Sequence, residues 1–260
     1  MREVAGKTAL LTGASSGLGP VIARRLHGQG VRFILSARRQ AELDSLAREL
    51  VGSRVITADL ARRGEAERLA AEAGPVDMLI ANAGIPVSGA LADLEVSDID
   101  RGLEVNLRAA IVLTRLLLGQ MVQRGSGHVV LMASLAGQVP GARNSVYNAT
   151  KFGLRGFSHA LRTELRGTGV GVSAISPSYV RETGMWHESG QHSPFEVSPG
   201  PVAEAVLRAI REDRAEITVA PFWGRFGGRL ALVAPRFFLR VAGGSGSIPE
   251  GVAERRKAKE

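Results

Sequence analysis

Tyr147 and Lys151 stand four residues apart in a segment whose apolar pattern predicts a helix, Ser145 to Arg166. Residues at this spacing lie on one helix face, so the phenol and the ammonium should be neighbours. A nearby ammonium favours the phenolate and lowers the phenol pKa, which suits Tyr147 to general acid–base chemistry. Ser134, at the end of a strand predicted over 129–133, is placed to hold a substrate oxygen. The Tyr–Lys spacing also arises by chance, so it needs the rest of the site.

The stretch Thr12–Gly19 reads TGASSGLG, between an apolar run and a helical pattern. A strand, a glycine turn and a helix in that order present backbone N–H groups to an anion. Gly13 would allow the tight turn, Gly17 would let a pyrophosphate approach the backbone, and Gly19 would let the helix pack closely. The glycine spacing is wider than G-x-G-x-x-G, so a plain strand-to-helix connection is the alternative. The residues expected to bind the cofactor here are Gly13, Ser15, Ser16, Gly17, Leu18 and Gly19.

Two arginines, Arg38 and Arg39, follow a second strand predicted over 31–37 and precede a helix over 40–50. Enzymes that use NAD commonly place an acid here, which bonds the ribose 2′-hydroxyl. Without a carboxylate, nothing repels a 2′-phosphate, and two guanidiniums can bind it. The alternative is that one or both arginines are merely exposed at a helix start.

Three further strand ends are expected to face the same crevice. A strand over 55–60 contains Asp59, which either bonds an adenine amino group or caps the next helix over 62–73, and Leu60 follows it. A strand over 76–81 leads into Asn82, Ala83 and Gly84, small residues that suit a crevice lined by backbone.

Asn106 interrupts a long helical pattern over 96–124. An asparagine inside a helix is mildly unfavourable and usually faces water. Its neighbours Val105 and Leu107 are apolar, and this placement favours a functional role.

The 260-residue chain has no cysteine and a formal net charge of +8. The first fact excludes disulfides and thiolate zinc sites, and the sequence predicts no metal ligands. The positive net charge is compatible with binding to nucleic acid, to an anionic membrane surface or to a polyanionic cofactor, or simply with a solvated basic surface. No nucleic-acid-binding motif accompanies the scattered arginines, so no nucleic-acid partner is expected. We expect no signal peptide and no spanning helix, and a cytoplasmic location.

Strands and helices alternate throughout, with a sixth strand over 170–175 and a last one over 217–220. This alternation predicts an α/β fold, a single doubly wound parallel sheet with helices on both faces. We expect one catalytic domain over residues 1–220. Residues 178–201, rich in Gly, Ser and Pro, are expected to form a mobile substrate loop.

Taken together and in this order, these motifs resemble the short-chain dehydrogenase/reductase family in its common single-domain form. The resemblance covers roughly residues 5 to 220. It implies a Rossmann-type fold of about seven parallel strands in the order 3-2-1-4-5-6-7, an NADP(H) cofactor and an assembly as a homodimer or homotetramer. It also implies that Tyr147 exchanges a proton with the substrate oxygen, while Lys151 binds the nicotinamide ribose. Ser134 would orient the substrate, and Asn106 would hold a water that links Lys151 to solvent.

The chain departs from the family pattern after the sixth strand. It reads Pro177-Ser178-Tyr179-Val180-Arg181-Glu182 where the family usually has Pro-Gly-x-Val-x-Thr. The resemblance implies that Pro177 and the Val180 amide still reach the cofactor, while the threonine role does not transfer. Pro20, directly after Gly19, suits a first helical turn.

Residues 221–244 mix aromatic and aliphatic residues with arginines, and Pro235 should interrupt any helix there. This segment fits a peripheral contact with an anionic membrane surface, a subunit contact or pocket cover, or plain core packing. Residues 245–260 are polar and expected to be disordered.

We therefore expect an NADP(H)-dependent oxidoreductase that interconverts an apolar secondary alcohol and a ketone. The alternatives are a catalytically silent NADP sensor and an adaptor at a nucleic acid or membrane surface. An intact Ser134, Tyr147 and Lys151 set disfavours the sensor, because binding alone needs no tuned phenol.

Overall fold

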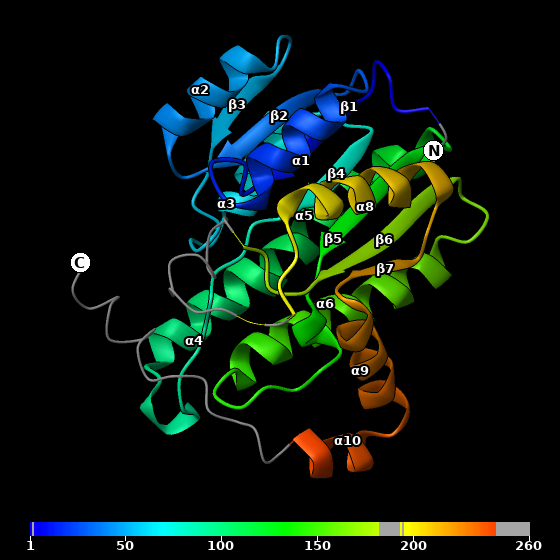
Figure 1. The fold of residues 1–260 in the computed structure, drawn as a ribbon. Helices are drawn as coiled ribbons and strands as arrows, with labels where there is room; N and C mark the ends of the chain where they lie inside the picture. Colours follow the sequence, from blue (N-terminus) through cyan, green and yellow to red (C-terminus); the bar gives the residue numbers. More distant parts are fainter. Residues whose placement is uncertain (2, 182–192, 194, 243–260) are drawn as a thin grey trace.

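The computed structural model describes residues 1, 3–181, 193 and 195–242. A seven-stranded parallel sheet in the order β3-β2-β1-β4-β5-β6-β7 forms its centre (Figure 1). This order confirms the predicted doubly wound α/β fold. The strands are β1 Thr8–Thr12, β2 Arg32–Ala37, β3 Arg54–Thr57, β4 Met78–Ala81, β5 Gly127–Met132, β6 Val170–Pro177 and β7 Glu216–Val219.

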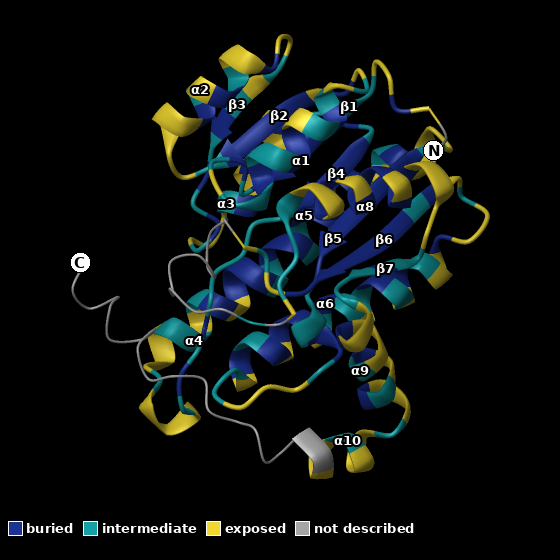
Figure 2. Cartoon of the chain, viewed as in Figure 1, coloured by how far each residue is buried: buried dark blue, intermediate teal, exposed yellow. Residues whose placement is uncertain are grey.

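Helices cover both faces of the sheet, because strands buried on both sides leave apolar side chains above and below. On one face α1, α2 and α8 pack around Ile22, Phe33 and Val206, and on the other α3, α5 and α6 pack around Leu69, Leu113 and Leu154. Figure 2 shows the buried sheet between these two layers. The helices are α1 Leu18–His27, α2 Gln40–Glu49, α3 Glu65–Ala73, α4 Val96–Leu103, α5 Ala109–Gln123, α6 Ser145–Glu164, α8 Pro199–Glu212, α9 Phe222–Val233 and α10 Pro235–Ala242.

The strand register places the carboxyl ends of β1, β2 and β4 at the same edge of the sheet. Leu10 of β1 lies opposite Ile34 of β2 and Leu79 of β4, so the three parallel strands finish side by side. The order of strands reverses between β1 and β4, where the chain leaves β1 in one direction and β4 in the other. Open α/β sheets bind ligands at such a switch point, outside the carboxyl ends of the strands.

Two predicted boundaries around the third strand are wrong. The strand ends at Thr57, so Asp59 and Leu60 lie in the following loop. The next helix begins at Glu65 with Gly64 as its N-cap, three residues later than predicted. Asp59 therefore does not cap α3. Its Oδ1 instead accepts a hydrogen bond of 3.2 Å from the Ala61 amide, a local turn that competes with helix formation.

The helical segment Val96–Gln123 is long and apolar enough to cross a membrane by length and composition, contrary to the expectation that no segment would be. Its α5 part places Leu113, Leu117 and Met121 in the core below the sheet. Packing within the protein thus accounts for part of this apolar composition, since 44% of the most apolar window is buried. Between α4 and α5 the chain forms a π-helical turn, Glu104–Arg108.

Candidate active site

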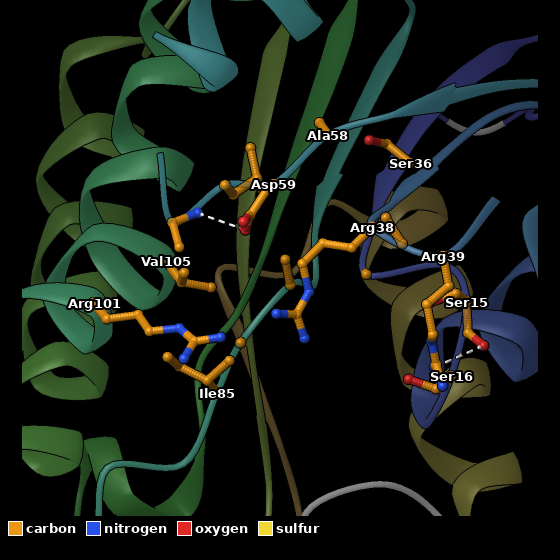
Figure 3. A pocket seen from close by; sticks show the side chains of 16 residues that line it. Ser15, Ser16, Ser36, Arg38, Arg39, Ala58, Asp59, Ile85, Arg101 and Val105 are labelled. Atoms are coloured by element: carbon orange, nitrogen blue, oxygen red, sulfur yellow. Dashed lines mark hydrogen bonds between the residues drawn. The ribbon is translucent and has the colours of Figure 1, made fainter. Parts of the chain in front are cut away.

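The switch point between β1 and β4 opens into a pocket of about 290 Å³ (Figure 3). It collects residues from the glycine turn, the end of β2, the loop after β3, the end of β4 and helix α4. The lining residues are Gly13, Ser15, Ser16, Ser36, Ala37, Arg38, Arg39, Ala58, Asp59, Leu60, Ala61, Ala83, Gly84, Ile85, Arg101 and Val105.

The glycine turn forms a cradle that side chains would fill. Gly13 has φ +67°, and a Cβ built on it would lie 2.9 Å from the Cα of Ala83. Gly17, at φ +62°, precedes α1 as its N-cap, and no side chain caps that helix end. A Cβ on Gly19 would collide with the Gly13 carbonyl, so the helix can lie this close only with glycine there. The turn therefore fits a phosphate group held by backbone N–H groups at a helix N-terminus.

Thr12 and Asn82 join the glycine turn to the end of β4. The Thr12 hydroxyl accepts hydrogen bonds from the amides of Asn82 and Ala83, at 3.1 and 3.0 Å. The Asn82 side-chain amide donates to the Thr12 carbonyl at 3.0 Å and to the Gly13 carbonyl at 3.3 Å. Asn82 thus holds the shape of the crevice. Thr12 was not predicted as a site residue, since its role depends on a strand 70 residues away.

Three arginines approach the pocket in different ways. The exposed Arg38 extends into it and has no hydrogen bond or ion pair within the described part of the chain (Figure 3). Arg39 turns toward the glycine loop, where it donates to the Ser15 hydroxyl at 3.3 Å and pairs with Glu42 at 3.4 Å. Arg101 of α4 reaches in from the opposite wall, likewise without a partner among the described residues. No sequence motif marked Arg101.

A second group of side chains lies beside the crevice, on the side of Gly84. It consists of Ser134, Tyr147 and Lys151. Ser134 follows β5, and its Oγ accepts from the Ala136 amide at 3.1 Å and donates to the Pro177 carbonyl at 3.4 Å. Its side chain also lowers the pKa of the Tyr147 phenol, which places the two groups near each other. Lys151 is buried, and its Nζ lies 5.6 Å from the centroid of the Tyr147 ring. A Cβ built on Gly84 would lie 3.6 Å from the same Nζ, so the lysine borders the crevice.

The pKa values of this pair differ from the sequence expectation. Desolvation raises the pKa of Tyr147 to about 12, and the Ser134 side chain offsets only part of that rise. The Lys151 ammonium is directed to the Met132 carbonyl, to which it donates a hydrogen bond of 2.8 Å. Burial lowers the pKa of Lys151 to about 8. The net shift of the Tyr147 pKa is therefore upward, opposite to the direction expected from the sequence, because burial of the phenol has the largest effect.

Asn106 lies in the π-helical turn and is buried at 1% exposure. Its Oδ1 accepts from the Ile85 amide at 2.7 Å, and its Nδ2 donates to the Ile85 carbonyl at 2.9 Å. The alternative that Asn106 faces water is wrong. The side chain instead fixes the backbone just after Gly84, and the wider π turn is the local distortion that accompanies it.

The segment after β6 lies beside Ser134. Pro177 and Ser178 are buried, and Val180 forms an isolated parallel bridge with Val197. This bridge ties the start of the expected substrate loop to its end. Half of that loop, including Glu182 and Thr183, lies outside the described residues. Among the residues that are described, no group of three or more His, Asp or Glu is arranged to hold a metal ion.

Comparison with known proteins identifies the family to which this chain is similar. A family model described as short chain dehydrogenase matches residues 7–194. The ketoacyl reductase HetN of Nostoc sp. is 40% identical over 230 residues, which cover 84% of this chain and 80% of HetN. An actinorhodin polyketide ketoreductase solved with NADPH has 34% identity and a TM-score of 0.74, covering 82% of this chain and 94% of its own. A short-chain dehydrogenase from Sphingobium yanoikuyae in complex with NADPH has 29% identity and a TM-score of 0.78, covering 94% and 97%.

Proposed function

Because this chain belongs to the short-chain dehydrogenase/reductase family and is an NAD(P)-dependent oxidoreductase, we propose that it reduces a ketone to a secondary alcohol with NADPH. The observation that carries the proposal is the convergence of Ser134, Tyr147 and Lys151 beside a glycine-cradled pocket that contains a free guanidinium, Arg38. When bound, the nicotinamide supplies the hydride. The protein supplies binding, orientation and the proton.

The cofactor preference is argued from charge. Arg38 and Arg101 face the pocket without partners in the described chain, and of the lining residues Asp59 alone carries a carboxylate. The Asp59 oxygens are engaged by the Ala61 amide and, at 3.7 Å, by Arg62. A 2′-phosphate would form charge-assisted hydrogen bonds with such guanidiniums. The solved relatives that carry NADPH support this choice of cofactor.

Each catalytic side chain has a proposed task. Tyr147, protonated at neutral pH, donates its proton to the oxygen of the reduced carbonyl. Ser134 donates a second hydrogen bond to that oxygen, which requires it to give up its long bond to Pro177. Lys151 borders Gly84 and would hold the ribose hydroxyls with its remaining donors. Asn106 keeps Ile85, and hence Gly84, in place.

The substrate is proposed to be apolar and small enough to enter beside Ser134. Leu135, directly after Ser134, packs under the glycine face of α9, and Phe195 contacts the same helix. Apolar side chains of this kind favour an acyl chain or a ring system over a charged metabolite. HetN and the polyketide enzyme are named as ketoreductases, which supports a ketone on such a carrier or chain.

The proposal is tested by NADPH oxidation with hydrophobic ketones, 3-oxoacyl thioesters and steroids, comparing Tyr147→Phe with the parent protein. Losing the proton donor should lower kcat by about a hundredfold or more, with NADPH affinity nearly unchanged. Tyr179→Phe, which alters the chain's only other tyrosine, should retain most of the turnover. Unchanged turnover in Tyr147→Phe would contradict the role of Tyr147 as proton donor. NADPH binding without turnover on any substrate would favour the sensor alternative.

A further inference from the structure

Helices α9 and α10 present an apolar and basic surface, which we call the C-terminal surface: the exposed residues of 222–240. We propose that this surface docks on an anionic lipid bilayer. Figure 2 shows both helices at one end of the molecule, with many exposed residues. The exposure, charge and position of these helices favour docking, whichever cofactor the enzyme uses.

Helix α9 buries its smallest residues and exposes its largest apolar ones, the reverse of a helix that only completes a core. The buried positions are Gly224, Gly228 and Ala231, which have almost no side chain to bury. The large apolar residues point outward instead, with exposed fractions of 70% for Phe222, 71% for Trp223, 54% for Phe226 and 86% for Val233. Phe222 and Phe226 are spaced by one helical turn and Val233 by two more, so they form one ridge. Core packing therefore does not explain these side chains.

The aromatic residues form a cluster on the surface. Trp223 makes edge-to-face contacts with Phe222, at 5.3 Å between ring centroids, and with Phe226, at 6.5 Å. Helix α10 adds Phe237 and Leu239, with exposed fractions of 57% and 54%. Contiguous exposed apolar patches of this kind mark an interaction site. Trp and Phe on an amphipathic helix are typical of insertion at the boundary between lipid headgroups and acyl chains.

Charge identifies the occupant. Arg225, Arg229, Arg236 and Arg240 are exposed, and no Asp or Glu occurs between Pro221 and Ala242. None of the four has an ion pair within the described chain. Arg225 and Arg229 also border a groove of about 630 Å³ that is shared with Arg208. The two carboxylates in that groove, Glu212 and Glu216, pair with Arg214 and Arg155 and leave Arg225 and Arg229 without a partner in the described chain. A second copy of the same surface would bring arginines against arginines, whereas an anionic headgroup layer neutralises all of them.

The buried face of α9, opposite the C-terminal surface, packs beside the segment that follows Ser134. A Cβ built on Gly228 would lie 3.2 Å from Leu135, the neighbour of Ser134, and one on Gly224 would lie 3.4 Å from Phe195. Docking would hold this side of the active site against the bilayer. If the proposed activity is correct, an apolar ketone can then enter from the lipid phase.

The test measures binding of the full-length protein to vesicles of phosphatidylcholine alone and of phosphatidylcholine mixed with phosphatidylglycerol, by co-sedimentation at low and high salt. Binding should require the anionic lipid and weaken with salt, since screening reduces attraction between exposed charges. Replacing all four arginines of the surface by Gln should lower the partition coefficient at least about tenfold. Replacing Phe222, Trp223 and Phe226 by Ser should do the same.

A charge-matched control keeps the interpretation specific. Arg255→Gln, Arg256→Gln, Lys257→Gln and Lys259→Gln, combined in one protein, remove four basic residues that follow residues 222–242 in the sequence and should leave binding nearly intact. In a Trp186→Phe protein, Trp223 is the sole tryptophan, and its fluorescence should shift to shorter wavelength with anionic vesicles. Equal binding to neutral vesicles, equal loss in the control, or no Trp223 shift would overturn the proposal. The proposal would also be overturned if the parent protein were a dimer that bound no vesicles and the aromatic substitutions dissociated that dimer.

Ketone reduction in vesicle-free buffer separates the two proposals. The arginine and aromatic variants should retain the parent activity toward a water-soluble ketone, because none of the changed side chains belongs to the catalytic set. Vesicle binding by a protein that reduces no ketone would leave docking standing and remove the proposed activity.

Discussion

Arg38 and Arg101 extend into the same pocket from opposite walls, one from the end of β2 and the other from α4 (Figure 3). Neither has a partner within the described chain. Two like charges facing a shared space repel each other unless an anion lies between them. The pocket is therefore built for a negatively charged group, and the glycine cradle beside it makes a nucleotide the suitable ligand.

Arg38→Ala and Arg101→Ala should each weaken NADPH binding by about ten- to a hundredfold, the loss of one charge-assisted hydrogen-bonding group. NADH, which has no 2′-phosphate, should lose less than about threefold. Cofactor fluorescence titration measures both affinities. Arg115→Ala, which removes an exposed arginine of α5 outside the pocket, is the matched control. Equal losses for the two cofactors would contradict the 2′-phosphate assignment.

The two directions of the reaction should respond differently to pH. Because the pKa of Tyr147 is raised to about 12, its phenol stays protonated through neutral pH, and ketone reduction should not vary with this group there. Alcohol oxidation needs the phenolate, whose fraction rises about tenfold per pH unit below the pKa. Profiles of kcat/KM in both directions provide the measurement. An oxidation rate that levels off near neutrality would mean that Lys151 does acidify the phenol during turnover.

Asn106→Ala should destabilise the fold by about 2 kcal/mol or more, because it leaves the Ile85 amide and carbonyl unpaired. Asn106→Asp retains an acceptor for the Ile85 amide but places a buried carboxylate against the Ile85 carbonyl, so it should be at least as destabilising at neutral pH. Urea unfolding gives the free energies of unfolding. A fall in kcat without any loss of stability would instead support a role through a bound water.

Gly13→Ala should reduce both stability and cofactor affinity. The new methyl group would lie 2.9 Å from Ala83 at a positive φ, which costs about 1–3 kcal/mol. Gly119→Ala is the matched control, since nothing lies within 4 Å of its Cβ on the exposed side of α5. That change should stabilise the helix by about 0.5–1 kcal/mol. Thermal unfolding and cofactor titration distinguish the two variants, and a Gly13→Ala protein with parental affinity would remove the cradle argument.

His128 should make the fold sensitive to acid. It is fully buried in β5, with Nε2 2.8 Å from the Ser173 hydroxyl, and burial lowers its pKa from 6.5 to about 3. The folded state therefore resists a proton that the unfolded state takes up below pH 6.5. Stability should fall by about 1.4 kcal/mol per pH unit between those values. Urea unfolding at neutral and acid pH should show a smaller loss in His128→Gln, and an identical loss would exclude this histidine as the cause.

Local pattern predicts those parts of the site that depend on chain order. The alternation of strands and helices predicts the doubly wound sheet, because a parallel strand needs a crossover helix to reach its neighbour. The helical repeat places Tyr147 and Lys151 on one face of α6, and the glycines of residues 12–19 mark a turn that only small residues can form. Pro235 correctly predicts the break between α9 and α10, because its ring cannot continue a helix.

The sequence by itself determined the fold and the order of the motifs. Both follow from hydrophobic periodicity and backbone sterics, which act within one segment of the chain. Only the tertiary structure decided which groups pair with which. In the folded chain Arg101 lies across the pocket from Arg38. The Lys151 ammonium donates a hydrogen bond to the Met132 carbonyl, and the Asn106 side chain accepts one from the Ile85 amide. The direction of the Tyr147 pKa shift was decided in the same way. Desolvation and hydrogen-bond partners depend on distances between residues far apart in the chain, and no local pattern records those distances.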